Sequence, residues 1–160
     1  MSRPNYRIGL LGASRIAPKA IIAPASKRDD CEIVALACRD VARGRAYAHE
    51  HGIPDVEVMA DYAALCARDD LDIIYNALPP SRHLDLARQA MGKVQLIEKP
   101  FALNATEAAQ IAAFPGIIME AFHHRYHPAF GHFLKATGNL GPLRHMTGRF
   151  HVTIPNNPSE

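Results

Sequence analysis

The clearest chemical signal in the sequence is the segment Gly12-Ala13-Ser14-Arg15-Ile16-Ala17. It follows an apolar run over residues 6–11 and precedes a helical pattern, which is the setting of a dinucleotide-binding turn. In such a turn Gly12 makes the tight bend and a small residue at position 17 packs the helix against the strand. Amides of the first helical turn and the positive end of the helix dipole then bind phosphate. We therefore predict that residues Gly12, Ala13, Ser14, Arg15 and Ile16 contact a dinucleotide.

The middle position of this G-x-S-x-x-A pattern is Ser14, where a glycine is usual. Its extra Cβ and hydroxyl either obstruct a pyrophosphate or donate a hydrogen bond to a phosphate oxygen. The pattern alone is weak evidence, and the alternative is a plain strand–helix turn with Gly12 at positive φ. Its position at the first strand–helix junction favours the dinucleotide interpretation.

The residues after the second apolar run, Cys38-Arg39-Asp40, indicate which of two coenzymes is bound. An acidic residue at this position would accept the ribose hydroxyls of NAD, whereas an arginine would pair with the additional phosphate of NADP. A guanidinium can hold a phosphate through two hydrogen bonds, and Asp40 is better suited to capping the following helix. The sequence thus favours NADP, with NAD possible; the alternative is that Arg39 is a solvated surface charge.

Short apolar runs alternate with helical patterns along most of the chain. The expected strands are continuous in apolar residues, which is typical of a parallel sheet covered on both faces. With right-handed crossovers, this pattern predicts an α/β fold with a doubly wound parallel Rossmann sheet of strand order 3-2-1-4-5-6. The expected strands are 6–11, 32–38, 56–59, 73–78, 94–97 and 117–119, and the expected helices are 16–23, 41–51, 62–66, 81–91 and 105–114. Asp40, Asp61, Ser81 and Asn104 are the expected helix caps.

The last part of the chain has a different pattern. We place a dinucleotide-binding domain at residues 1–121 and the beginning of another domain at 122–160. A helical stretch over 123–136 precedes residues 143–154, where apolar and polar side chains alternate as in an antiparallel strand with one wet face. Because an isolated strand is not a stable end to a fold, we expect a fragment, or the truncated start of an α+β antiparallel-sheet domain.

Composition excludes several classes of protein. The 160 residues carry a formal charge of +2 and no dense run of lysine or arginine, so nothing points to a nucleic-acid or membrane partner. No apolar stretch is long enough to span a bilayer, and the N-terminus does not resemble a signal peptide. Cys31, Cys38 and Cys66 are odd in number and lack a C-x-x-C spacing, which favours a cytoplasmic location with reduced thiols.

A cluster of histidines near residue 125 raises the question of a metal. His123 and His127 share one helix face at i,i+4, and Glu120 and His124 have the same spacing. No further cysteine or carboxylate cluster completes a ligand set. We therefore predict no metal site.

The sequence resembles the Gfo/Idh/MocA oxidoreductases (the glucose–fructose oxidoreductase/inositol dehydrogenase family). Three ordered motifs carry the resemblance: GLLGASRIA at residues 9–17, a strand followed by E-K-P at Glu98-Lys99-Pro100 and F-A-L-N-A at residues 101–105, and MEAFHHRYHP at residues 119–128. Within the family, the similarity is greatest to the branch that contains trans-dihydrodiol dehydrogenase and NADP-dependent D-xylose dehydrogenase. The resemblance implies a Rossmann domain followed by a large antiparallel sheet that forms the substrate site and often a dimer interface.

The resemblance also implies roles for individual residues. Lys99 would reach the nicotinamide and the substrate hydroxyl as a catalytic or proton-relay residue, and Glu98 would border the nicotinamide ribose. Pro79 and His83 resemble a segment that covers the coenzyme. The alternatives are a surface lysine after a strand and, for His83, a residue that simply begins a helix. Pro80 departs from the family, where asparagine is usual at this position.

The function implied is hydride transfer between a nicotinamide coenzyme and a CH–OH group of a sugar, polyol or cyclic diol. Arg125 and Tyr126 either contact such a substrate or pack between domains, and the complete protein is expected to form a homodimer. The second-domain motif with the Asp and His that commonly complete the family's active site is absent from the sequence. The alternative is therefore a catalytically silent NADP-binding module.

Overall fold

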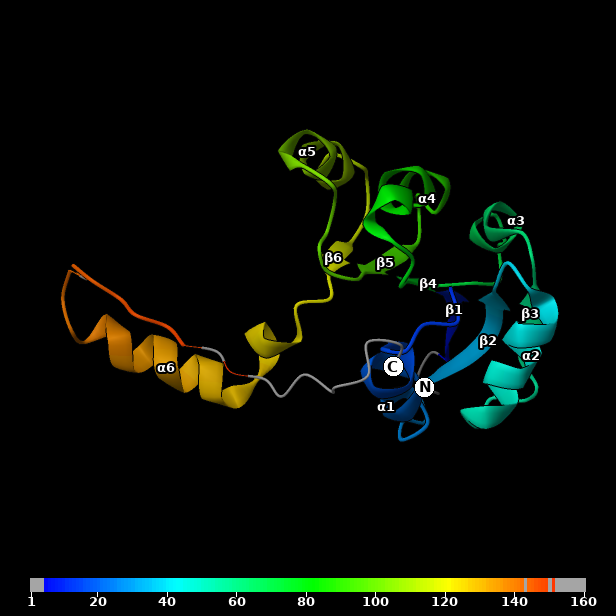
Figure 1. Cartoon of the computed structure of the whole chain (residues 1–160), viewed down its shortest axis with the longest axis horizontal. Coiled ribbons are helices and arrows are strands. Elements are labelled where there is room, and N and C mark those ends of the chain that lie inside the picture. Colours follow the sequence, from blue (N-terminus) through cyan, green and yellow to red (C-terminus); the bar gives the residue numbers. More distant parts are fainter. Residues whose placement is uncertain (1–4, 143, 150, 152–160) are drawn as a thin grey trace. The chain divides into compact units, whose positions relative to one another are not determined.

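Six parallel strands form one sheet in this computed structural model, which describes residues 5–142, 144–149 and 151 (Figure 1). Their order is β3-β2-β1-β4-β5-β6, as predicted, with a crossover from β3 back past β1 to β4. The doubly wound arrangement is therefore confirmed. The strands are β1 (Tyr6–Leu11), β2 (Cys31–Ala37), β3 (Glu57–Met59), β4 (Ile73–Asn76), β5 (Val94–Ile97) and β6 (Ile118–Glu120).

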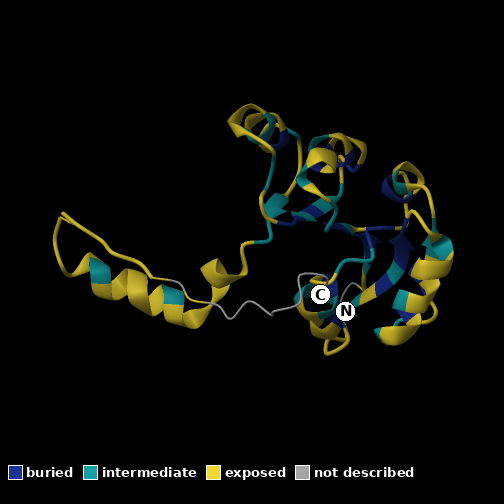
Figure 2. Ribbon diagram, viewed as in Figure 1, coloured by how far each residue is buried: buried dark blue, intermediate teal, exposed yellow. Residues whose placement is uncertain are grey.

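Helices cover both faces of this sheet, and the strands between them are the most buried part of the chain (Figure 2). One apolar cluster joins the first helical segment and α2 to one face, and the other clusters join α3, α4 and α5 to the opposite face. The helical elements are η1 (Pro18–Ile22), α1 (Ala23–Ala25), α2 (Val41–Glu50), α3 (Tyr62–Cys66), η2 (Pro80–Arg82), α4 (His83–Gln89), α5 (Ala105–Ala112), η3 (His123–Tyr126) and α6 (Pro128–Gly138).

Side chains of the central strands supply the core. Leu10 and Leu36 are fully buried on one face of the sheet, and Leu11 and Ile74 are buried on the other. Each such side chain contributes roughly 1.5–3 kcal/mol of transfer free energy on burial. Burial on both faces explains why these strands are continuous in apolar residues.

Three predicted helix caps are confirmed. The Asp40 carboxylate accepts a hydrogen bond of 3.1 Å from the Arg43 amide at the start of α2. Asp61 caps α3 in the same way, and Asn104 caps α5 by accepting from the amide of Glu107. Each cap satisfies a helix amide that would otherwise lack a partner.

Other local predictions were wrong. Ser81 does not cap α4, because residues 80–82 form the tight turn η2 and the helix begins at His83. The strand predicted to reach residue 78 ends at Asn76, whose side-chain oxygen accepts a hydrogen bond of 3.2 Å from the Leu78 amide and turns the chain. The helix predicted to end at residue 23 continues to Ala25, and Pro18 lies at its first position in a π-helical turn.

The chain divides into two compact units, Met1–Phe122 and His123–Glu160. The second unit contains η3 and α6, which are separated by His127. Nδ1 of His127 accepts a hydrogen bond from the Ala129 amide and so caps α6. Residues 144–149 and 151 form no strand, and the remainder of the strand predicted over 143–154 lies outside the described residues. No antiparallel sheet is therefore seen in the described part of this unit.

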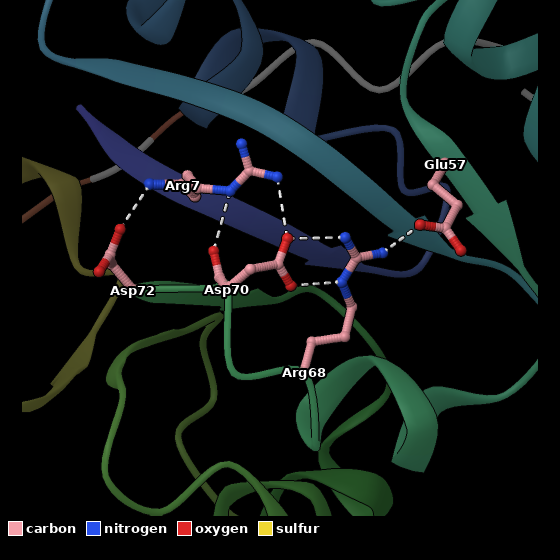
Figure 3. A network of polar contacts seen from close by, with 5 residues as sticks. All are labelled: Arg7, Glu57, Arg68, Asp70 and Asp72. Carbon is pink, nitrogen blue, oxygen red and sulfur yellow. Dashed lines mark hydrogen bonds and ion pairs between the residues drawn. The ribbon is translucent and has the colours of Figure 1, made fainter.

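The amino-terminal edge of the sheet is held by a network of ion pairs (Figure 3). The Asp70 carboxylate accepts hydrogen bonds from Arg68 at 2.8 and 2.9 Å and from Arg7 at 2.8 Å. Arg68 also pairs with Glu57, and the Arg7 amide donates to Asp72. Hydrogen bonds from Arg68, and next from Arg7, hold the pKa of Asp70 far below its usual range. This network joins the starts of β1, β3 and β4.

Candidate functional site

The predicted dinucleotide residues gather at the carboxyl edge of the sheet, where ligands bind in folds of this type. A cavity of about 740 Å³ opens there, which is within the usual range for ligand pockets. Turns after β1, β2 and β4 surround it. Its lining residues are Gly12, Ala13, Ser14, Cys38, Arg39, Asp40, Arg43, Tyr62, Ala77, Leu78, Pro79 and Arg82. A smaller cavity of about 250 Å³ lies at the amino end of β2 and contains none of the predicted site residues among its described lining.

The turn after β1 has the backbone that its glycine was expected to supply. Gly12 has φ +96°, and its amide donates a hydrogen bond of 2.9 Å to the Ala37 carbonyl at the end of β2. A Cβ at this position would lie 2.9 Å from Cδ2 of Leu78, which that flexible side chain could yield to, so it is the positive φ that favours glycine here. Ala17 is fully buried, which fits its expected role of packing the helix against the sheet.

Ser14 uses its polar groups within the turn. Its hydroxyl oxygen accepts a hydrogen bond of 3.2 Å from the Ala17 amide, and its own amide donates to the Gly12 carbonyl at 3.0 Å. The extra hydroxyl thus caps the first helical turn, and its proton remains able to donate to a phosphate oxygen. Arg15 and Ile16 follow as exposed residues at the start of this helix. The structure therefore accommodates serine at the usual glycine position.

Arg39 lines the same cavity at the end of β2. It is exposed, and its amide donates a hydrogen bond of 3.2 Å to the hydroxyl of Tyr62. Asp40 turns its carboxylate toward the α2 amides, as described above. Arg39 is thus one of the residues that line the cavity, and its contact with a ribose phosphate stays a prediction.

Two further arginines line the cavity and were missed by the sequence analysis. Arg43 lies in the first turn of α2, four residues after Arg39, and Arg82 ends η2. The Arg82 guanidinium lies 5.8 Å from the centroid of the Tyr62 ring, within cation–π distance. Three guanidinium groups against the single carboxylate of Asp40 give the cavity a positive potential that attracts phosphates. The signal available in the sequence was that Arg43 lies in the first turn of the helix that begins just after Arg39.

Glu98 and Lys99 follow β5 at the same edge. Glu98 is only 6% exposed, and its carboxylate accepts hydrogen bonds from the Tyr75 hydroxyl at 2.7 Å and from the Lys99 amide at 3.2 Å. Burial, and then the negative charge of Glu98, raises the pKa of Tyr75, so its hydroxyl remains a donor. Lys99 is exposed and its peptide bond to Pro100 is cis. The sequence analysis did not anticipate Tyr75, which it treated as part of a strand.

His83 and Pro79 occupy different positions in the loop after β4. Pro79 is exposed and lines the cavity, whereas the His83 ring is fully buried. Its nitrogens lie 2.8 Å from the Leu78 carbonyl oxygen and 3.1 Å from the Phe101 carbonyl oxygen. The imidazole thus joins the loop after β4 to the loop after β5. His83 is also the first residue of α4, and its contact with a coenzyme stays a prediction.

The remaining candidates lie in or near the second unit. Arg125 and Tyr126 are exposed in η3, and their contact with a substrate stays a prediction. Glu120 accepts a hydrogen bond of 3.1 Å from the Phe101 amide, so its carboxylate stabilises the turn after Pro100. No group of three or more metal-binding side chains occurs within the described residues. The described residues also contain no helix that is long and apolar enough to cross a membrane.

A comparison with protein families agrees with this geometry. The model described as "Oxidoreductase family, NAD-binding Rossmann fold" matches residues 6–114. The chain belongs to the Gfo/Idh/MocA oxidoreductase family. The resemblance stated from the three motifs is thereby confirmed, and residues 6–114 form a NAD(P)-binding Rossmann domain of this family.

Similar proteins within the Gfo/Idh/MocA family act on sugars and diols. The chain is 36% identical to D-xylose 1-dehydrogenase (NADP(+)) 2 of Haloferax volcanii, over 92% of this chain and 46% of that protein. It is 28% identical to trans-1,2-dihydrobenzene-1,2-diol dehydrogenase of Xenopus tropicalis, over 91% of this chain and 45% of that protein. The chain therefore spans about half the length of the curated relatives it matches.

The fold of this chain is also similar to that of a solved structure. KijD10, a 3-ketoreductase from Actinomadura kijaniata in complex with NADP, matches with a TM-score of 0.73 and 27% identity. The match covers 84% of this chain and 44% of that chain.

Proposed function

We propose that this chain is the coenzyme-binding part of an NADP-dependent oxidoreductase that transfers a hydride between the nicotinamide and a CH–OH group of a sugar or cyclic diol. The observation that carries the proposal is that the glycine turn at Gly12 and the guanidinium of Arg39 line a single cavity. A diphosphate at the turn and a ribose phosphate at Arg39 would therefore belong to the same ligand. NAD remains possible as a second coenzyme.

The residues of the cavity fit the parts of this coenzyme. The turn at residues 12–16 would hold the diphosphate through its amides and the Ser14 hydroxyl. Arg39 would hold the 2′-phosphate, with Arg43 adding positive charge from the next helical turn. Tyr62 and Arg82 would flank the adenine, since both present flat groups to the cavity. Pro79 would pack over the coenzyme from the loop after β4.

At the other end of the coenzyme, Glu98 and Lys99 would border the nicotinamide. Bound NADP supplies the hydride acceptor for alcohol oxidation, or the hydride for the reverse reaction. The part of the protein is to orient the reacting groups and to move a proton. We assign the proton to Nζ of Lys99, which would receive it from the substrate hydroxyl as the carbonyl forms. Glu98, fixed by Tyr75 and by the Lys99 amide, would hold the ribose beside it.

The substrate class is inferred from the substrates that the names of the relatives give. Those named above act on D-xylose and on a dihydrobenzene diol. We infer a polyol, sugar or cyclic diol for this chain, with Arg125 and Tyr126 as candidate contacts. We also infer a homodimer for the complete enzyme and a cytoplasmic location, the latter supported by three cysteines that are all unpaired.

A second candidate function is a catalytically silent NADP-binding module. It is the alternative to the enzyme that the sequence analysis left open. Coenzyme binding without turnover by any protein that contains this chain would support it. A spectrophotometric screen of aldoses and cyclic diols with NADP distinguishes the two candidates, because only the oxidoreductase produces NADPH absorbance.

The experiment that tests coenzyme binding is a titration of the 160-residue chain with NADPH and with NADH, followed by fluorescence. Arg39→Ala should weaken NADPH binding by roughly 10- to 100-fold, as expected for lost hydrogen bonds to a charged group, and should leave NADH binding within about twofold of the unmodified chain. Arg45→Ala is the matched control, because Arg45 is exposed on α2, which follows Arg39, and is not among the residues that line the cavity. Equal losses for both coenzymes would contradict the role of Arg39, and no binding of either coenzyme would contradict the proposed function.

A further inference from the structure

Tyr47 on α2 contacts the turn that follows β1. It is not one of the described residues that line the cavity, yet its hydroxyl donates a hydrogen bond of 2.8 Å to the Ser14 carbonyl. Its ring packs edge-on against His51, with centroids 4.4 Å apart. The side chain thus contacts both the turn, through its hydroxyl, and His51, through its ring.

The close approach of α2 to the sheet makes this contact possible. Gly44, one turn before Tyr47, lies where an added Cβ would be 2.6 Å from Cγ1 of Val58 and 3.1 Å from Cβ of Cys38. A larger residue would therefore force the helix away from β2 and β3. The Asp40 cap fixes the start of the same helix, one turn before Gly44. Together these features fix how closely α2 approaches the sheet, and therefore where the Tyr47 hydroxyl lies relative to the turn.

The hydrogen bond from Tyr47 fixes a peptide plane. In a trans peptide the carbonyl and the following N–H point in opposite directions. Because the Ser14 carbonyl points toward Tyr47, the amide of the same peptide unit points away from Tyr47. The Ser14 amide and hydroxyl are held by Gly12 and Ala17, so Tyr47 completes the fixation of this residue.

The tyrosine hydroxyl is suited to this task. Burial, and next the charge of Glu50, raises the pKa of Tyr47 to about 12. The hydroxyl is therefore protonated throughout the physiological range and remains a donor to the carbonyl. Phenylalanine would fill the same space without this donor, which makes Tyr47→Phe a clean test.

We propose that Tyr47 is a positioning residue for diphosphate binding: it holds the Ser14–Arg15 peptide so that the turn is formed before the coenzyme arrives. This inference rests on the proposed function and deepens it. A turn that is already ordered loses less conformational entropy on binding, so the affinity for the coenzyme is higher. The benefit applies only to ligands that contact the turn.

The experiment compares two ligands on the 160-residue chain: NADPH, which carries the diphosphate, and adenosine 2′-monophosphate, which lacks it. Tyr47→Phe should weaken NADPH binding about three- to tenfold, the value of one hydrogen bond. Binding of adenosine 2′-monophosphate should change by less than about twofold. Tyr6→Phe is the matched control, since Tyr6 lies at the amino end of β1 and is 44% exposed. It should change neither affinity.

A second measurement needs no ligand. Hydrogen exchange of the amides at residues 12–17 should be faster in Tyr47→Phe than in the unmodified chain, while exchange in β4 and β5 should be unchanged.

The possible outcomes separate this inference from the proposed function. If the unmodified chain does not bind NADPH, the proposed function fails and this inference fails with it. If the unmodified chain binds NADPH and Tyr47→Phe binds it equally well, only the role of Tyr47 is contradicted. Equal weakening of both ligands would also contradict it, because that result indicates a general loss of the pocket.

Discussion

The Tyr75 hydroxyl donates a hydrogen bond of 2.7 Å to the carboxylate of Glu98, the residue directly before Lys99. Tyr75 lies in β4, opposite Leu96 of the parallel strand β5, and Glu98 directly follows the end of β5. Only 2% of Tyr75 and 6% of Glu98 are exposed. A carboxylate at this depth requires hydrogen-bond partners, because an unsatisfied buried charge is costly. Tyr75 thus supports the segment to which we assign proton transfer.

Tyr75→Phe should therefore lower the free energy of unfolding by about 1–3 kcal/mol, the cost of a buried group left unsatisfied. Urea denaturation of the 160-residue chain measures this change. Tyr6→Phe serves as the control, because it removes an exposed hydroxyl. A loss for Tyr75→Phe that is no larger than the loss for Tyr6→Phe would show that the Glu98 carboxylate does not depend on this hydroxyl.

Lys99→Ala tests the catalytic assignment and must be made in the complete enzyme. Removal of a general acid–base group should lower turnover by about 10²- to 10⁴-fold. The Kd for NADPH should change by only about a few-fold, since Lys99 is assigned to the reacting hydroxyl and not to the phosphates. Lys93→Ala is the control, because Lys93 directly precedes the opposite end of the same strand, β5. A Lys99→Ala enzyme with unchanged turnover would contradict the assignment.

Local patterns in the sequence were sufficient to predict the sheet. Each strand of a parallel sheet carries its signal in its own residues, as in Tyr6–Leu11 and Val94–Ile97, whose predicted bounds match those of β1 and β5. Helix caps are equally local, which is why Asp40, Asp61 and Asn104 were found. The turn at Gly12 and the position of Arg39 follow from strand order, because consecutive strands in this fold place their carboxyl ends side by side.

Contacts between distant residues explain what sequence analysis missed. Tyr47 and Ser14 are 33 residues apart, and Tyr75 and Glu98 are 23 apart. Neither tyrosine belongs to a short motif, so only the fold reveals its partner. The failure at Ser81 has a local cause, since three residues of tight turn precede the helix there. Of the strand expected over 143–154, residues 144–149 and 151 form no strand, and the rest lies outside the described residues.

The tight packing of α2 predicts opposite effects for two glycine substitutions. Gly44→Ala should destabilise the chain by about 1–3 kcal/mol, because its Cβ would overlap Val58. This cost exceeds the gain of about 1 kcal/mol in helix propensity that alanine normally brings. At Gly131 in α6 nothing lies within 4 Å of an added Cβ, so Gly131→Ala should increase helical content.

Circular dichroism and urea denaturation measure both glycine variants. The repair variant Gly44→Ala/Val58→Ala should recover part of the lost stability, since it removes the methyl group that the new Cβ meets. A stabilising effect of Gly44→Ala alone would show that α2 can move outward at little cost. In that case the contact between Tyr47 and Ser14 would also lose its fixed geometry.

The ion-pair network at the amino edge predicts a pH dependence whose sign follows from Asp70. Hydrogen bonds from Arg68, then Arg7, lower the pKa of Asp70 in the folded chain, whereas in the unfolded chain it returns to about 3.9. The unfolded state therefore binds the proton more readily, and the stabilisation is present above about pH 4 and is lost as the pH falls toward the folded value. Because the Asp70 side chain is 42% exposed, the effect should be about 1 kcal/mol or less.

Asp70→Asn should accordingly be less stable than the unmodified chain at pH 7, and this difference should shrink as the pH falls below about 4. Addition of about 1 M NaCl at pH 7 should reduce the difference as well, because salt screens exposed charges. Asp69→Asn is the matched control, since Asp69 is the exposed neighbour outside the network drawn in Figure 3. Urea denaturation at pH 7 and pH 3 measures both variants. A difference between Asp70→Asn and the unmodified chain that stays constant over this interval would mean that the carboxylate contributes nothing through its charge, and that Arg7 and Arg68 hold the starts of β1 and β4 without it.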